Sequence, residues 1–161
     1  MSDPPEPVRD FDLNSFLPYR LSAVANRISR IFAEHYREEF GITIPEWRVL
    51  AHLGHAGAVS VRDIEARVDM EKSKVSRAAS RLEEAGYITK RVHGADRRLL
   101  ELRLTPEGEA LVTRILPVAI AFQHEMLARL GTAAPELERA LDILLDGGEA
   151  AARPLAGKAG G

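Results

Sequence analysis

The sequence of 161 residues contains no cysteine. This absence excludes a disulfide framework and any redox switch that depends on a thiolate. We recognise no signal peptide and no apolar run long enough to span a bilayer, so we expect a cytoplasmic protein that has no membrane partner. The length suits one domain and is sufficient to bury a core.

Catalytic motifs are also missing. Three serines, Ser73, Ser76 and Ser80, lie close together, but no nucleophile-elbow motif surrounds them. No glycine-rich phosphate loop is present either. The sequence therefore predicts neither an enzyme nor a bound cofactor.

The five histidines do not form a metal-binding motif. His52 and His55 are three residues apart on an expected helix and could share a face, and His35 or His124 could join them. Without cysteine or a histidine-rich cluster, we predict no metal site. We interpret these histidines as partly buried at the seams between packed helices.

Basic residues are concentrated in one segment of an otherwise acidic chain. The formal net charge is −2, which by itself argues against nucleic-acid binding. Residues 72–103 nevertheless hold nine basic and four acidic side chains, a net charge of +5, which leaves −7 for the remainder. A local positive field on an acidic body is suited to oriented docking on DNA.

A helix predicted over residues 71–85 lies within this basic segment. One face of this helix is apolar. The opposite face carries hydroxyl groups, which let a helix approach base edges closely, and arginines, which are forked donors for guanine or phosphate. A solvated helix face is the alternative interpretation. Gly86 is placed for a left-handed C-cap. The apolar stripe consists of Val75, Ala78, Ala79, Leu82 and Ala85, and the polar face of Ser73, Ser76, Arg77, Ser80, Arg81 and Glu84.

A shorter helix is expected immediately before it. Ser60 and Asp63 have the spacing of a capping box, and Asp69, in the connecting turn, is expected to cap the second helix. Two short helices joined this tightly indicate a helix-turn-helix, which places its second helix in the major groove. The buried side of the first helix is predicted to be Val61, Ile64 and Val68.

A β-hairpin is predicted next. Residues 87–92 are rich in β-branched and aromatic types, and residues 100–104 alternate leucine with charged residues. Between them, Arg97 and Arg98 form a basic tip suited to a narrow minor groove, and Asp96 is expected to hold one of them by an ion pair. A solvated loop is the alternative. A short strand at residues 58–59 is expected to pair with this hairpin.

These elements resemble the MarR (multiple antibiotic resistance regulator) family of transcription regulators over about residues 13–146. The resemblance implies a mainly α fold with a small β wing, a homodimer on a palindromic operator, usual repression, and a small-molecule pocket whose occupancy weakens DNA binding. The lack of cysteine excludes the peroxide sensing known in one branch of that family. The matching segments are residues 44–50, 72–77, 81–88, 96–98 and 102–108.

We predict that two sets of residues form functional sites. The DNA contacts are Arg62, Lys72, Ser73, Lys74, Ser76, Arg77, Arg81, Arg91, Asp96, Arg97 and Arg98. The effector pocket implied by the resemblance is assigned to Tyr19, Arg20, Tyr36, Trp47, His52 and His55.

A small aromatic acid or its thioester would suit such an effector pocket, with Arg20 as its carboxylate anchor. Tyr36 and Trp47 could equally be plain core residues. Two other functions remain open from the residues themselves: a weakly specific DNA binder without an effector, and a module that binds another protein.

The expected domain organisation follows from the helical pattern. Residues 1–12 form a disordered acidic arm, residues 42–105 the winged helix-turn-helix domain, and residues 147–161 a flexible tail. Residues 13–40 and 106–146 form a helical dimerisation region, because their apolar stripes exceed what a small winged domain can cover.

Several helix boundaries are also predicted. Gly41 ends the first long helix, and Thr43 with Glu46 forms a capping box for the next one. Thr105 caps the long helix that begins at Pro106, which Pro117 should kink, and a last helix is expected over residues 135–146.

Overall fold

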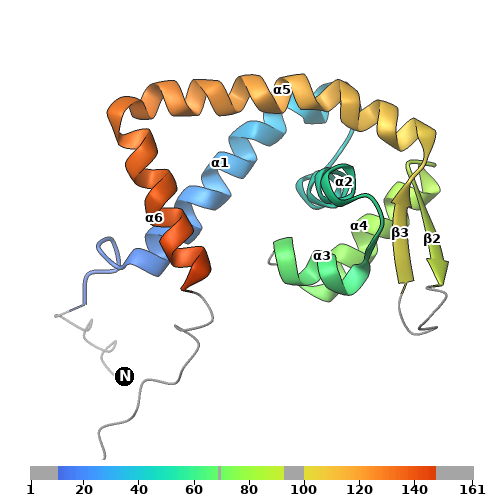
Figure 1. Cartoon of the computed structure of the whole chain (residues 1–161), viewed down its shortest axis with the longest axis horizontal. Coiled ribbons are helices and arrows are strands. Elements are labelled where there is room, and N and C mark those ends of the chain that lie inside the picture. The colour runs from blue at the N-terminus through green and yellow to red at the C-terminus, as the bar shows by residue number, and fades with distance from the viewer. Residues whose placement is uncertain (1–10, 69, 93–99, 148–161) are drawn as a thin grey trace, which may run out of the picture. The chain divides into compact units, whose positions relative to one another are not determined.

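The computed structural model describes residues 11–68, 70–92 and 100–147. The chain divides into two compact units, Met1–Ala119 and Ile120–Gly161, and the boundary between them falls inside one long helix. The elements, drawn in Figure 1, are α1 (Leu17–Phe40), α2 (Ile44–Ala56), β1 (Val59–Ser60), α3 (Val61–Val68), α4 (Lys72–Glu84), β2 (Ile88–Val92), β3 (Leu100–Leu104), α5 (Pro106–Leu130), a 3₁₀ turn (Gly131–Ala133) and α6 (Ala134–Asp146).

The sheet is small and antiparallel, in the order β1-β3-β2. Lys90 on β2 pairs with Leu102 on β3, and Val59 on β1 pairs with the same leucine from the other side. Leu102 is fully buried because it lies at the centre of the sheet. The predicted mainly α fold with a β wing and a short third strand is confirmed.

Two helices begin with the predicted capping boxes. The backbone N–H of Thr43 donates to the Glu46 carboxylate at 2.9 Å at the start of α2. At α3, the Asp63 N–H donates to the Ser60 hydroxyl at 3.1 Å, and that hydroxyl donates to the Asp63 carboxylate at 2.7 Å. These side chains satisfy donors that a helix N-terminus otherwise leaves without a partner.

Helix α4 is one residue shorter at each end than predicted. Glu71 occupies its N-cap position and makes no side-chain capping bond, so the prediction that Asp69 caps this helix stays a prediction. Asp69 lies outside the described residues. Ala85 was predicted to belong to the buried apolar stripe. It is instead the C-cap, beyond the last helical residue, and it is exposed.

The end of α4 has the predicted glycine. Gly86 has a φ of +80°, and the N–H groups of Gly86 and Tyr87 donate to the carbonyls of Glu83 and Leu82. This Schellman arrangement reverses the chain directly into β2.

Both long helices have a proline in their first turn. Helix α1 begins at Leu17, and Pro18 is accommodated in its first turn, where its missing N–H costs nothing. Helix α5 starts as predicted, with the Gly108 N–H donating to the Thr105 hydroxyl at 3.0 Å. It continues on both sides of Pro117, whose kink stays a prediction.

One apolar core lies within the Met1–Ala119 unit. The first half of α5 is tied to α1, since Arg114 lies 3.4 Å from the Glu39 carboxylate and over the Phe40 ring at 4.9 Å. The core residues are Ala33, Tyr36, Ile42, Val49, Leu50, Leu53, Ile64, Met70, Val75, Ala78, Ala79, Leu82, Ile88, Leu102, Leu111, Val112 and Ile115.

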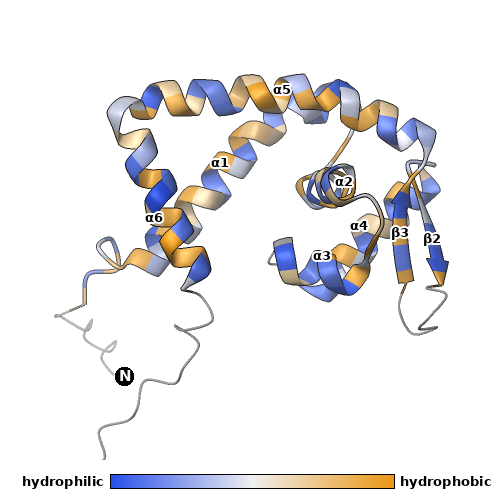
Figure 2. Cartoon of the chain, in the orientation of Figure 1, coloured by the Kyte–Doolittle hydropathy of each residue, from blue (hydrophilic) through white to orange (hydrophobic). Residues whose placement is uncertain are grey.

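Helices α5 and α6 carry apolar residues that alternate with polar ones (Figure 2). Within Pro106–Asp146, one stretch is long and apolar enough to cross a membrane by length and composition alone, and 17% of it is buried. This finding corrects the expectation that no apolar run is long enough to span a bilayer. Length and composition do not separate a membrane span from an apolar helix of a soluble protein that has a partner.

Candidate nucleic-acid interface

Helix α4 presents a polar face to solvent. Its buried side packs against α2, α3 and β2, through Val75, Ala78, Ala79 and Leu82. A helix anchored on one side by this stripe must direct its other residues outward. The exposed members of the predicted set on this helix are Lys72, Ser73, Lys74, Ser76, Arg77 and Arg81.

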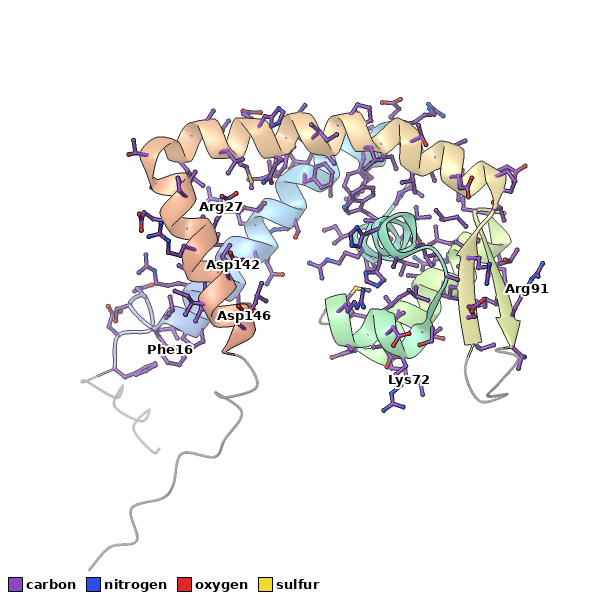
Figure 3. The ribbon with its side chains drawn as sticks, in the orientation of Figure 1. Phe16, Arg27, Lys72, Arg91, Asp142 and Asp146 are labelled. Carbon is purple, nitrogen blue, oxygen red and sulfur yellow. The ribbon has the colours of Figure 1, made fainter. Side chains whose placement is uncertain are left out.

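The N-terminal half of α4 combines short and forked side chains. The Arg77 Nε donates to the Ser73 carbonyl at 3.3 Å, which aligns the side chain along the helix, and Arg77 as a whole is exposed. Lys72 begins the helix, where aligned peptide dipoles already favour an anion. Figure 3 shows Lys72 and Arg91 pointing away from the body of the domain. This arrangement is suited to phosphates and base edges.

The two flanks of α4 hold ion pairs. Lys74 lies 4.0 Å from the Glu71 carboxylate. Arg81 lies 3.8 Å from Glu46, which is 6% exposed and also caps α2. Arg81 therefore already has an ion-pair partner within its own domain, although its side chain is 68% exposed.

Ser80 does not belong to the exposed polar face that helical periodicity predicts for it. It is half-buried, and its hydroxyl accepts a hydrogen bond from the Lys90 Nζ at 2.9 Å. Lys90 also lies 3.1 Å from the Glu83 carboxylate. The period-two pattern of a strand could have shown that Lys90 lies on the same face as the buried Ile88, two residues before it, but not which residue it bonds to.

The remaining predicted DNA contacts lie on α3 and the hairpin. Arg62 on α3 and Arg91 on β2 are both exposed. Asp96, Arg97 and Arg98, the predicted wing tip, lie outside the described residues.

A groove of about 850 Å³ opens between α1, α2 and the start of α4. Tyr19 lines it, and so do three cationic side chains, Arg30, Arg48 and Lys74. The Arg48 guanidinium donates to the Ser29 hydroxyl at 3.4 Å. The full lining is Tyr19, Ser22, Ala23, Asn26, Ser29, Arg30, Ile44, Pro45, Arg48, Met70, Glu71 and Lys74.

The other predicted effector residues are dispersed. Tyr36 is fully buried, 4.9 Å from the Phe32 ring centroid and 5.8 Å from that of Trp47, and burial raises its pKa to about 12. This aromatic cluster belongs to the core. Arg20 is exposed on α1.

The histidines of α2 lie apart from that cluster. His52 is half-buried, and burial followed by the nearby positive charge of Arg67 lowers its pKa. His55 is exposed. In the described part of the chain, no three His, Asp or Glu side chains are grouped so that they could hold a metal ion.

A short strand, then a helix pair with a tight turn, then an antiparallel hairpin that pairs with the short strand make up a winged helix-turn-helix, a class of DNA-binding domain. Residues 40–99 match the sequence profile of the MarR family. The chain is 30% identical over 117 residues to the uncharacterized HTH-type transcriptional regulator YwoH of Bacillus subtilis, covering 71% of this chain and 85% of YwoH.

Solved structures agree with this assignment. The MarR family regulator SPO1453 of Silicibacter pomeroyi is 30% identical, with a TM-score of 0.70 over 85% of this chain and 98% of that one. Bordetella bronchiseptica BpsR, solved in a study of its regulation by 6-hydroxynicotinic acid, is 23% identical and shares the fold, with a TM-score of 0.71 over 84% and 96%. The chain belongs to the MarR family and is a DNA-binding transcription regulator.

Proposed function

We propose that this protein is a homodimeric repressor that binds an inverted-repeat operator and is released by a small ligand. The observation that carries the proposal is the exposed face of α4, where Ser73, Ser76 and Arg77 follow Lys72 on a helix anchored by a buried stripe. Hydroxyl and guanidinium groups on such a face supply both base readout and phosphate contacts. Repression follows if the occupied operator excludes the transcription machinery.

Dimerisation is supported by apolar side chains that nothing in their own unit covers. Among residues 120–147 none is buried, and α6 exposes Leu137, Leu141, Leu144 and Leu145. Exposed leucines spaced in this way indicate a partner surface. We assign residues 13–40 and 106–146 to dimerisation and residues 42–105 to DNA binding.

A two-fold dimer constrains the operator. It would present two copies of α4 to successive major-groove turns, about 34–36 Å apart on one side of the duplex. The half-sites should therefore form an inverted repeat, and we propose that Arg62, Arg91 and the wing residues Asp96, Arg97 and Arg98 contact the flanking backbone and minor groove.

The groove between α1, α2 and α4 is our proposed effector site. Its cationic lining suits a carboxylate, and Tyr19 offers an aromatic wall. Glu71, the N-cap of α4, and Lys74, in its first turn, both line the groove, so an occupant there would act on the recognition helix directly. A small aromatic acid fits this chemistry, and the regulation of BpsR by 6-hydroxynicotinic acid supports the same class. An acyl thioester is the second candidate.

The buried Tyr36 and the half-buried Trp47 are proposed to support this groove from the core rather than to touch the ligand. Arg20, His52 and His55 remain secondary candidates, because they are not among the residues that line it. Relatives of this chain are regulators rather than enzymes, and we propose that it acts in the cytoplasm without a cofactor.

Replacing Arg77 by Ala tests the docking mode. The variant should lose about 1–3 kcal/mol of operator affinity at fixed salt and discriminate less between operator and scrambled duplex. The measurement is a mobility shift or anisotropy titration on the DNA upstream of the protein's own gene, with candidate aromatic acids added.

Arg37→Ala is the matched control, since Arg37 is exposed in the last turn of α1. Unchanged operator affinity in Arg77→Ala would contradict the proposed role of α4. Equal affinity of the wild-type protein for scrambled and operator duplexes would instead identify a weakly specific binder.

A further inference from the structure

Lys90 lies in the basic segment but is not placed to contact DNA. Its side chain is only 20% exposed, whereas that of its neighbour Arg91 points into solvent. Alternation along β2 puts Lys90 on the same face as Ile88, which is 2% exposed. The ammonium group therefore lies on the side of β2 that packs against α4.

The Lys90 ammonium group has two partners on α4. The Nζ donates to the Ser80 hydroxyl at 2.9 Å and lies 3.1 Å from the Glu83 carboxylate. Ser80 and Glu83 are three residues apart, so both lie on one flank of the helix. Charge-assisted bonds of this length are directional and stronger than bonds between neutral groups.

The apolar contacts of α4 do not by themselves hold the helix firmly against rotation about its axis. Two residues of its buried stripe are alanines, Ala78 and Ala79. Methyl groups interlock weakly with their neighbours, so they resist rotation of the helix about its axis less than large side chains do. The polar bonds to Lys90 on one flank, and the Arg81–Glu46 pair on the other, oppose that rotation.

We propose that Lys90 is a positioning residue for DNA recognition. It fixes the rotation of α4 relative to β2, and so sets the direction in which Ser73 and Arg77 face the major groove, without touching DNA itself. The inference rests on the proposed role of α4 in operator recognition.

Salt dependence separates a positioning cation from a cation that binds phosphate. Removal of one phosphate-binding cation lowers the slope of log K against log salt by about 0.9, whereas removal of a positioning residue leaves the slope unchanged. Loss of positioning instead weakens base contacts, and so lowers operator affinity without lowering affinity for random duplex.

The experiment compares Lys90→Met and Arg91→Met in the full-length dimer. Methionine keeps an aliphatic stem and removes the charge. For Lys90→Met we expect operator affinity to fall about tenfold, with unchanged affinity for scrambled duplex and an unchanged salt slope. For Arg91→Met we expect both affinities to fall together and the slope to drop by about 0.9.

A double-mutant cycle connects the effect to α4. Lys90→Met should have little further effect on operator affinity in a Ser80→Ala/Glu83→Gln background, because the bonds it removes are already absent there. Lys90→Arg, which keeps the charge near both partners, should restore most of the discrimination and serves as the test variant if Lys90→Met fails to fold.

A salt slope that drops in Lys90→Met as it does in Arg91→Met would overturn the proposal, and so would full additivity in the cycle or wild-type discrimination in Lys90→Met. If the wild-type protein itself does not distinguish operator from scrambled duplex, the proposed function fails. Failure of the proposed function can be told apart from failure of the Lys90 proposal, because it is seen with the wild-type protein before any variant is compared.

Discussion

The two compact units of this chain differ in where their apolar residues lie. In Met1–Ala119, leucines such as Leu50 and Leu82 are buried, at 0% and 1% exposure. In Ile120–Gly161, no described residue is buried, and Leu145 is 78% exposed. Both segments are rich in leucine, so composition does not cause the difference.

The difference indicates that the units obtain their stability in different ways. The first unit encloses a core with α1 to α4, the sheet and the first half of α5, although α1 exposes Leu17, Leu21 and Val24 near its start. The second unit consists of the C-terminal half of α5 and of α6, and two helices alone cannot enclose a core. Its stability should therefore depend on a second copy and on protein concentration.

Truncating the core of the first unit should have the largest effect. Leu50→Ala removes a fully buried side chain and should lower the free energy of unfolding by about 2–5 kcal/mol, at every protein concentration. Chemical denaturation at two concentrations tests this. In the same assay Leu145→Ala should change little in dilute protein, and equal losses in both variants would remove the distinction between the units.

A charge on α6 should break the assembly and leave the first unit folded. We expect Leu141→Asp to weaken dimerisation by roughly 2–4 kcal/mol, because an unpaired carboxylate would be buried against the second copy. Sedimentation velocity measures the dissociation, and circular dichroism follows the fold.

Arg139→Ala is the control for this helix, since its pair with Glu136 at 3.6 Å is exposed and contributes little. A Leu141→Asp protein that remains dimeric would show that α6 does not form the interface.

The smallest effect should be an acid sensitivity confined to the first unit. Hydrogen bonds from Ser60 hold the pKa of Asp63 below its usual value. A lowered folded pKa means that the cap stabilises the protein above the unfolded pKa of about 3.9, and that this contribution is lost as pH falls through the folded value.

Thermal unfolding of the wild-type protein and Asp63→Asn between pH 7 and pH 3 measures this contribution. The two proteins should differ most at neutral pH and converge in acid. A gap that stays constant over this range would assign the effect of the substitution to something other than the carboxylate charge.

The sequence predicted the elements of the first unit because local signals determine them. The capping box at Ser60 and Asp63, the Gly86 turn and the alternating leucines of β3 each act over a few residues. The ends of α4 were less predictable, because helix ends shift by one or two residues with their tertiary surroundings.

The candidate site was less accessible to the same reasoning. Helical periodicity placed Ser73 and Arg77 on an exposed face, as the structure has them. It could not reveal that Ser80 bonds to Lys90, which lies ten residues further along the chain on another element. The groove is a similar case, since it is made by three helices and no single stretch of sequence encodes it.

The aromatic cluster around Tyr36 has a practical consequence. Trp47 is the only tryptophan in the chain, and its neighbours Ile44 and Arg48 line the groove. Its emission should thus report on that groove without any added label. A titration followed in the fluorimeter would show whether an aromatic acid quenches the indole at the same concentration at which it frees the operator.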